Sequence, residues 1–151
     1  MKRFLMLTTV VIAAVISLSS CSSSSRTIAI EEGWELIGET KVNFVRDRGT
    51  INVLNTTNYS AIRFKVEKKS IRLKSLNIVF PNGDKLSPLV DSDIDADQYS
   101  REIGISQTGR NIRSIDFNYR SKGNLLKGRA KVLVFGKRYV APPSPTPVTT
   151  N

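Results

Sequence analysis

Apolar and polar side chains alternate along most of the chain between residues 31 and 139. Residues 62–67, for example, have the sequence Ile-Arg-Phe-Lys-Val-Glu, and residues 115–120 repeat the alternation. A period of two residues puts the apolar side chains on one face of a β-strand and the charged ones on the other. No stretch longer than two helical turns in this region has a helical period, so the pattern predicts an all-β domain.

Eight segments have the β-branched, aromatic or alternating composition of strands, and turn formers such as Gly, Asn and Asp lie between them. The predicted strands are residues 36–45, 50–53, 62–66, 71–80, 85–90, 101–105, 112–119 and 129–135. About eight short strands in one domain without helices favour an antiparallel β-sandwich, with a closed β-barrel as the alternative.

The strand predicted at residues 71–80 changes phase in its middle. Its apolar side chains fall on odd positions up to Leu73 and on even positions from Leu76 onward. One extra residue in a strand restores such a phase, which predicts a β-bulge near Lys74 and Ser75. The Asn82-Gly83 pair that follows adopts positive φ at low cost and predicts a hairpin to the next strand.

The first 20 residues have the plan of a signal peptide. Lys2 and Arg3 precede an uncharged, almost wholly apolar stretch, and the sequence then runs Leu18-Ser19-Ser20-Cys21. These four residues resemble the lipobox of bacterial lipoproteins, which implies that Cys21 carries a diacylglyceryl group and becomes the first residue after cleavage. The alternatives are an ordinary secretory signal and an uncleaved membrane anchor, for which the apolar stretch is short.

The composition divides the remaining chain into three parts. Residues 21–30 contain the lipidated cysteine and a polar, Ser-rich tether, and residues 31–139 are the predicted sandwich domain. Residues 140–151 contain four prolines between positions 142 and 147, which predicts a disordered tail. Ser22 beside Cys21 resembles the outer-membrane sorting pattern of Gram-negative lipoproteins, so we expect an outer-membrane protein that faces the periplasm.

The chain contains no histidine, and Cys21 is its only cysteine. A histidine-based triad, a cysteine protease and an ordinary zinc site are therefore excluded. Paired carboxylates, Lys, Tyr and Ser remain for catalysis, but no pair of carboxylates can be nominated. We expect no enzymatic activity, no catalytic residues and no cofactor other than a possible calcium ion.

The calcium hypothesis rests on Asp91, Asp93 and Asp95, with Glu102 at the twelfth position counted from Asp91. This spacing matches the oxygen ligands of a calcium loop. Ala96, however, stands where such loops need glycine for a sharp turn. The favoured interpretation is an exposed acidic loop.

The mature chain is basic. Removing Lys2 and Arg3 from 23 basic residues leaves 21 against 13 acidic ones, a net charge near +8. This surplus favours anionic partners such as lipid headgroups or envelope glycans, while export argues against nucleic acid. The predicted stripe comprises Arg63, Lys65, Lys68, Lys69, Arg72 and Lys74, with Arg113, Arg120, Arg129 and Lys131 as an extension. An equal alternative is a charged face that resists edge pairing.

Trp34 is the only tryptophan of the chain. An exposed tryptophan on a concave sheet would favour sugar binding, whereas a tryptophan near Leu36 and Ile37 is more often part of the core. We expect Trp34 to be a core residue.

Several short motifs together resemble a family of small exported bacterial domains. They are Gly33-Trp34-Glu35-Leu36-Ile37-Gly38, Val42-Asn43-Phe44, Val79-Phe80-Pro81-Asn82-Gly83, Ser100-Arg101, Tyr119-Arg120 and Gly128-Arg129-Ala130. The resemblance implies a β-sandwich of unknown function with no established catalytic residues. The aspartates of residues 91–97 depart from the family pattern, which has a glycine-containing turn there.

These observations lead to one main functional hypothesis and one alternative. The first is a membrane-anchored envelope lipoprotein that presents a non-catalytic β-sandwich for binding or structural support. The alternative is a carbohydrate- or calcium-binding module of a larger envelope assembly.

Overall fold

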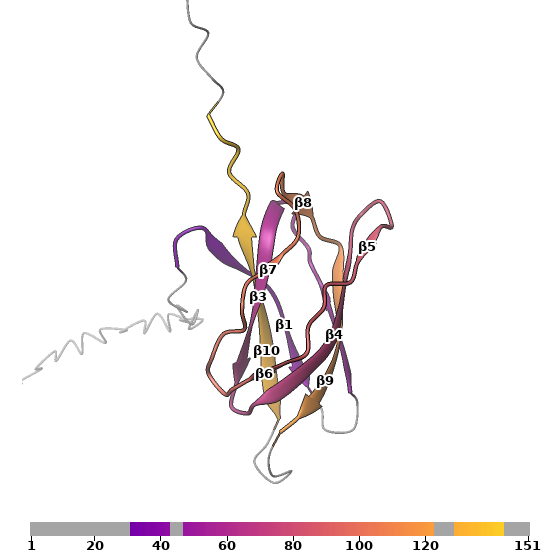
Figure 1. Ribbon diagram of the computed structural model, residues 1–151, viewed down its shortest axis with the longest axis vertical. Helices are drawn as coiled ribbons and strands as arrows, with labels where there is room; N and C mark the ends of the chain where they lie inside the picture. Colours follow the sequence, from indigo (N-terminus) through magenta and orange to yellow (C-terminus); the bar gives the residue numbers. More distant parts are fainter. Residues whose placement is uncertain (1–30, 43–46, 123–128, 144–151) are drawn as a thin grey trace, which may run out of the picture.

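The protein forms two antiparallel β-sheets, seen in a computed structural model that describes residues 31–42, 47–122 and 129–143 (Figure 1). The described residues contain no helix. The strands are β1 (Trp34–Val42), β2 (Arg48–Asn52), β3 (Asn58–Glu67), β4 (Ile71–Val79), β5 (Lys85–Leu86), β6 (Ser92–Ile94), β7 (Ile103–Gly104), β8 (Arg110–Asn111), β9 (Ser114–Ser121) and β10 (Ala130–Arg138).

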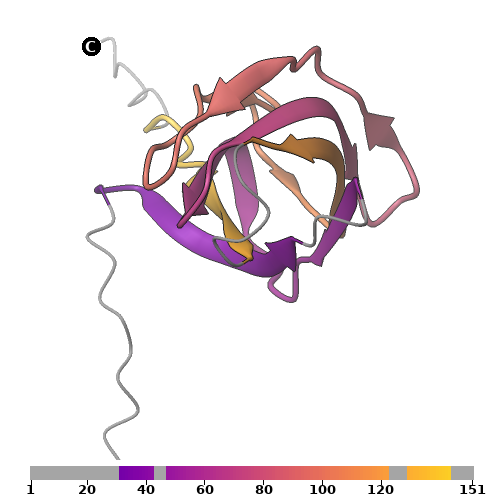
Figure 2. The ribbon, with the colours of Figure 1, turned by 90° about the horizontal axis from the view of Figure 1, so that it is seen from below.

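Each sheet has three long neighbouring strands and two short ones. Sheet A has the order β1-β10-β3, with β7 and β8 both paired to β3. Sheet B has the order β2-β9-β4, with β5 and β6 both paired to β4. Seen from below, the two sheets curve around a common interior (Figure 2). The all-β sandwich predicted from the sequence is confirmed, and the closed barrel is not formed.

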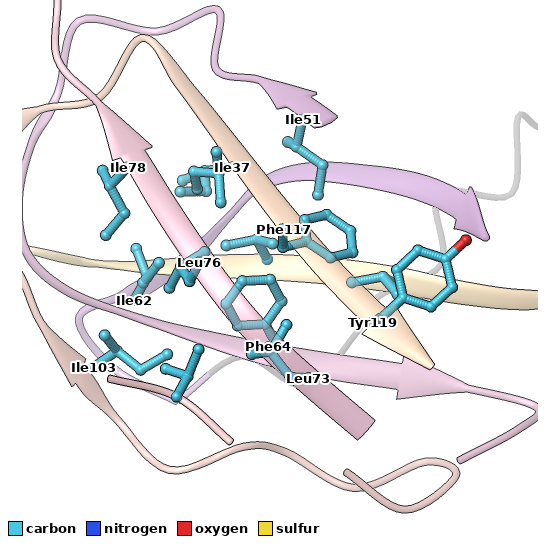
Figure 3. Close-up of a cluster of buried hydrophobic side chains, with 14 of the residues drawn as sticks. Ile37, Ile51, Ile62, Phe64, Leu73, Leu76, Ile78, Ile103, Phe117 and Tyr119 are labelled. Carbon is cyan, nitrogen blue, oxygen red and sulfur yellow. The ribbon is translucent and has the colours of Figure 1, made fainter. Parts of the chain in front are cut away.

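Apolar side chains from the inner faces of both sheets fill the space between them (Figure 3). Phe64 of β3 and Phe117 of β9 meet across this space, with ring centroids 5.7 Å apart and ring planes inclined by 67°. The alternation predicted for β3, β4 and β9 is confirmed on these inner faces, because Ile62, Leu76 and Ile115 are also fully buried.

The predicted bulge and hairpin are both present. The register between β4 and β9 shifts between Leu73 and Ser75. After β4, the Phe80 amide donates to the Asp84 carbonyl at 2.9 Å, and Gly83 adopts a φ of +89°. The strand predicted at residues 85–90 is shorter than expected, since β5 ends at Leu86.

The described chain begins and ends at the same end of the sandwich. Trp34 lies opposite Lys137, and the Arg138 amide donates to the Gly33 carbonyl at 2.8 Å. β1 then runs to the other end, where Val42 lies opposite Ala130. In the part of the chain that the structure describes, no helix is long and apolar enough to span a membrane. The predicted signal peptide, Cys21 and residues 144–151 lie outside that part.

Candidate functional site

The outer face of sheet B carries two rows of polar side chains that cross three strands. In the first row, Thr50 of β2, Asp116 of β9 and Asn77 of β4 lie side by side. In the second row, Arg48, Asn118 and Ser75 do the same. The row between them consists of Gly49, Phe117 and Leu76, which lie on the inner face of the sheet because side chains alternate along each strand. Strand alternation therefore assembles six polar side chains on one surface.

Hydrogen bonds fix the orientation of this polar face. The Thr50 hydroxyl donates to Asp116 Oδ1 at 2.7 Å, and Asn118 Nδ2 donates to Ser75 Oγ at 2.6 Å. The Ser87 hydroxyl donates to Asn77 Oδ1 at 2.6 Å. The amide nitrogen of Asn77, the amide oxygen of Asn118 and the guanidinium of Arg48 have no partner among the described residues, so both donors and acceptors remain free for a ligand.

The face is hollowed between these rows. The hollow has a volume of about 440 Å³, and Arg48, Thr50, Asn77, Asp116 and Asn118 supply its polar lining. One arginine and one aspartate make the lining neutral in sum at pH 7. Asn77, Asp116 and Asn118 are half-buried, so their positions are restrained by the neighbouring strands.

These residue types are unusual in the middle of strands. Asn and Asp have low β-propensity, and Thr50 is the one β-branched residue among the polar side chains of the hollow. Residues with a low propensity for the structure that they adopt are expected where function constrains the sequence. This signal was available in the sequence, but strand alternation identified Asp116 and Asn118 only as outward-facing residues and did not single out Asn77.

The outer face of sheet A is organised around Arg63. Its guanidinium carbon lies 4.3 Å from the ring centroid of Trp34 and 4.2 Å from that of Tyr99. Arg63 is only 9% exposed, and its Nη1 donates to Glu31 at 2.9 Å. Its Nε and Nη2 are buried without a hydrogen-bond acceptor, so the two aromatic rings are the main compensation for their charge.

Trp34 therefore does not occupy the position predicted from the sequence. It is half-buried on the outer face of sheet A and is not part of the main core. Strand alternation explains the difference, because Trp34 lies on the same outer face as Leu36 and Arg63. Ile37 points into the core, next to the register shift between Leu36 and Gly38. The ring contacts Arg63 and does not form an open platform for a sugar.

The predicted positive stripe is not one surface. Arg63 and Lys65 belong to sheet A, whereas Arg72 and Lys74 belong to sheet B. The solvent exposure predicted for Arg63 and Lys69 was wrong, since Arg63 is 9% and Lys69 is 6% exposed. The alternation rule placed them on the outer side, but it did not foresee that neighbouring side chains would cover that side.

The residues of the extension lie in several places. Arg113 follows β8 and Arg120 lies in β9, while Arg129 and Lys131 lie at the start of β10. Lys68, in the turn after β3, lines a hollow together with Arg129 and Lys131. The fold therefore divides the predicted set into separate groups, since Arg72 and Lys74 line another hollow on sheet B.

The carboxylates of the predicted calcium loop point to separate partners. Arg72 Nε donates to Asp91 at 2.8 Å, Asp93 forms an ion pair with Lys122, and Glu102 faces Lys137 at 3.3 Å. Asp95 is exposed in the turn that follows β6. The segment is not an open loop, because β6 pairs with β4. Within the described ranges, no group of three or more acidic or cysteine side chains is placed to hold a metal ion.

Three clusters of ionisable groups in the described residues have shifted pKa values. In the hairpin after β4, hydrogen bonds from Asn82 and Arg110 lower the pKa of Asp84. The hydrogen bond from Arg72 lowers the pKa of Asp91. Where Tyr59 of β3 meets the start of β1, burial and the hydrogen bond that its hydroxyl donates to Glu35 together raise the pKa of Tyr59 to about 12. Burial tends to raise the pKa of Glu35, but hydrogen bonds from Tyr59 and Arg138 outweigh that effect and lower it. These contacts connect the start of β1 to Tyr59 of β3 and Arg138 of β10.

Comparisons with known proteins identify a family and leave its activity open. The model of a family described as a domain of unknown function (DUF2541) matches residues 5–136, which agrees with the resemblance to an uncharacterised domain. None of the curated proteins matches the chain. A solved structure of AlgX from Pseudomonas aeruginosa, described as a structural and functional characterization, is similar with a TM-score of 0.46 and 9% identity over 70% of this chain. The similar region spans 27% of the AlgX chain.

Proposed function

Since the chain belongs to the DUF2541 family, a domain of unknown function, we propose a role from its own geometry. The protein is an exported, lipid-anchored and non-catalytic binding module, and the hollow on sheet B binds a hydroxyl-rich saccharide of the cell envelope. The observation that supports this proposal is the pair of polar rows led by Asp116 and Asn118.

The chemistry of the hollow suits a sugar better than an ion. A saccharide hydroxyl both donates and accepts a hydrogen bond, so it needs a lining that offers both functions. Asn77 offers a free donor, Asn118 a free acceptor, and Asp116 a carboxylate that is anchored by Thr50. The hollow has no exposed aromatic ring among its lining residues. We therefore expect hydrogen bonding to provide the specificity and the affinity for one sugar unit to be modest.

The test is a titration of the purified protein with oligosaccharides released from the bacterial envelope, measured by isothermal calorimetry. The double variant Asn77→Ala, Asn118→Ala should lose binding at least tenfold, because it removes the free donor and the free acceptor together. The matched control is Asn52→Ala, Asn58→Ala, which removes two exposed asparagines that do not line the hollow. Equal losses in the two double variants, or no binding by the unchanged protein, would refute the saccharide proposal.

The anchor is a separate part of the proposal and rests on the sequence of residues 1–21. Acyl chains on Cys21 would each contribute about 0.8 kcal/mol per buried methylene, and two or more chains hold a protein durably to a bilayer. Mass spectrometry of the protein from its native membrane should show Cys21 as the first residue with an added acyl mass. An intact Met1, or Cys21 without acyl groups, would contradict the anchor and leave the saccharide proposal untouched.

A further inference from the structure

A second hollow lies at the end of the sandwich opposite the start of β1. Four cationic side chains surround it: Lys41 at the end of β1, Lys68 in the turn after β3, and Arg129 and Lys131 at the start of β10. Its volume is about 280 Å³, and the backbone of Ala130 forms part of its lining. Three segments that are distant in the sequence therefore bring like charges to one place.

The charges of this basic hollow are only partly compensated. Lys131 forms an ion pair with Glu39, and Glu67 lies opposite Lys131 in the register of β3 and β10. Lys41, Lys68 and Arg129 are exposed and have no ion pair within the described residues. Four cations thus face two carboxylates, and the local potential is positive.

Two local features make this arrangement unfavourable for the isolated domain. Lys41 lies directly opposite Lys131 across β1 and β10, and like charges in that position repel each other. Lys68 adopts a φ of +75°, a left-handed conformation that is costly for a residue with a Cβ atom. When a fold retains a charge repulsion and a strained backbone conformation at one place, a binding function at that place is the expected reason.

We propose that the basic hollow binds an oxyanion, a phosphate or carboxylate group of a ligand that approaches the end of the sandwich opposite the start of β1. Arg129 offers a planar fork for two oxygens of one group, and the lysines offer mobile point charges around it. The size of the hollow suits one such group and its point of attachment. The proposal does not depend on the saccharide site, which uses other residues on sheet B.

The experiment measures binding of pyrophosphate and of citrate to the full chain, purified in a non-ionic detergent, by calorimetry at low salt. Lys41→Gln, Lys68→Gln should weaken the binding of the preferred anion at least fivefold. The matched control is Lys85→Gln, Arg113→Gln, which removes the same charge from exposed positions that do not line the hollow. We expect less than a twofold change there. Equal effects of the two double variants would mean that only net charge attracts the anion, and the proposal would fall.

A further arm replaces pyrophosphate by mixed micelles that contain phosphatidylglycerol. Binding that depends on Lys41 and Lys68 in the micelles identifies a lipid headgroup as the source of the phosphate, and binding to pyrophosphate alone identifies a soluble or polymeric source. Absence of binding to pyrophosphate, citrate and the micelles by the unchanged protein would overturn the proposal.

The stability of the variants provides an independent check. Lys68→Gly should raise the thermal midpoint, because glycine adopts the positive φ without strain, and should also weaken anion binding. An anion should raise the midpoint of the unchanged protein more than that of Lys68→Gly. A variant that unfolds earlier than the unchanged protein, yet binds the anion equally well, would show that Lys68 has a structural role and would contradict its place in the site.

Discussion

The outer faces of the two sheets differ in what their side chains do. On sheet A, Phe135 and Leu133 are fully buried on the side that faces away from the main core, and Arg63 is stacked between two rings above them. On sheet B, the corresponding side carries the rows of Asp116 and Asn118, and these side chains remain half-open to solvent. The first face is a small second core, and the second is a surface available to a ligand.

The difference shows that strand alternation predicts the side of a residue better than its environment. Tyr99 lies in the segment that runs along the edge of β3, opposite Lys65, and its ring packs 5.5 Å from that of Phe135. This edge segment helps to close the outer face of sheet A. Sheet B has no comparable cover over its polar rows in the described residues, so its outer side chains stay accessible.

The largest effect is expected for Phe135→Ala. The side chain is fully buried on the outer face of sheet A, and its removal should lower the free energy of unfolding by about 3–5 kcal/mol. Chemical denaturation followed by tryptophan fluorescence measures this loss. A cost of about 0.5 kcal/mol or less, the range of ordinary surface substitutions, would show that the outer face of sheet A is not a second core.

Arg63→Ala should cost about 2 kcal/mol, because it removes two desolvated cation–π contacts. Arg63→Met should cost much less, since an apolar side chain of similar length fills the space and leaves no buried, unpaired nitrogen. Arg113→Ala, at an exposed position, is the control. If Arg63→Met lowers the free energy of unfolding as much as Arg63→Ala does, the charge itself is needed and the stacking explanation is incomplete.

The loss of folding stability at alkaline pH should depend on Tyr59, a residue of β3. Its pKa of about 12 in the folded protein lies above the ordinary value of 10.0, so the protonated phenol stabilises the fold fully below pH 10. That contribution should be lost as the pH rises from about 10 through about 12. Tyr59→Phe, which cannot ionise, should show a shallower fall in thermal midpoint over this range, and identical slopes would contradict the assignment.

The smallest effect on stability is expected for Asn77→Ala and Asn118→Ala on sheet B. Surface substitutions of this kind change the free energy of unfolding by about 0.5 kcal/mol or less, although each removes one hydrogen bond between exposed or half-buried groups. Urea denaturation of the two variants beside Phe135→Ala would sharpen the contrast between the faces. A large loss of stability would mean that the polar rows support the fold.

The periodicity of apolar residues predicted the fold class, the inner faces of the long strands and the bulge near Lys74, and the Asn82-Gly83 pair predicted the hairpin. Each of these features depends on residues that are close together in the sequence, so the pattern within one segment was enough to predict it. The strands β6 and β8 were missed, because each is two or three residues long and exists only through pairing with β4 or β3. No periodic pattern can appear in segments of that length.

The candidate sites were predicted less well, because they depend on which strands become neighbours. The rows of Asn77 and Asp116 join β4 to β9, and the basic hollow joins β1 to β10, so neither could be found along a single segment. Lys41 was not among the predicted residues for this reason. The calcium prediction was wrong for the opposite reason. Asp91 and Asp95 have the spacing of a calcium loop in the sequence, but the residues between them form β6 and pair with β4, so the carboxylates do not converge.

The position of the two chain ends has a mechanical consequence. β1 and β10 are neighbours, and the described chain enters beside Trp34 and leaves beside Arg138. A pulling force between these ends would open the ladder one residue pair at a time, beginning at Trp34 and Lys137, because the hydrogen bonds lie across the strands and in line with the force. The domain would unzip under low tension, and it is therefore suited to ending a tether and unsuited to transmitting load between two attachment points.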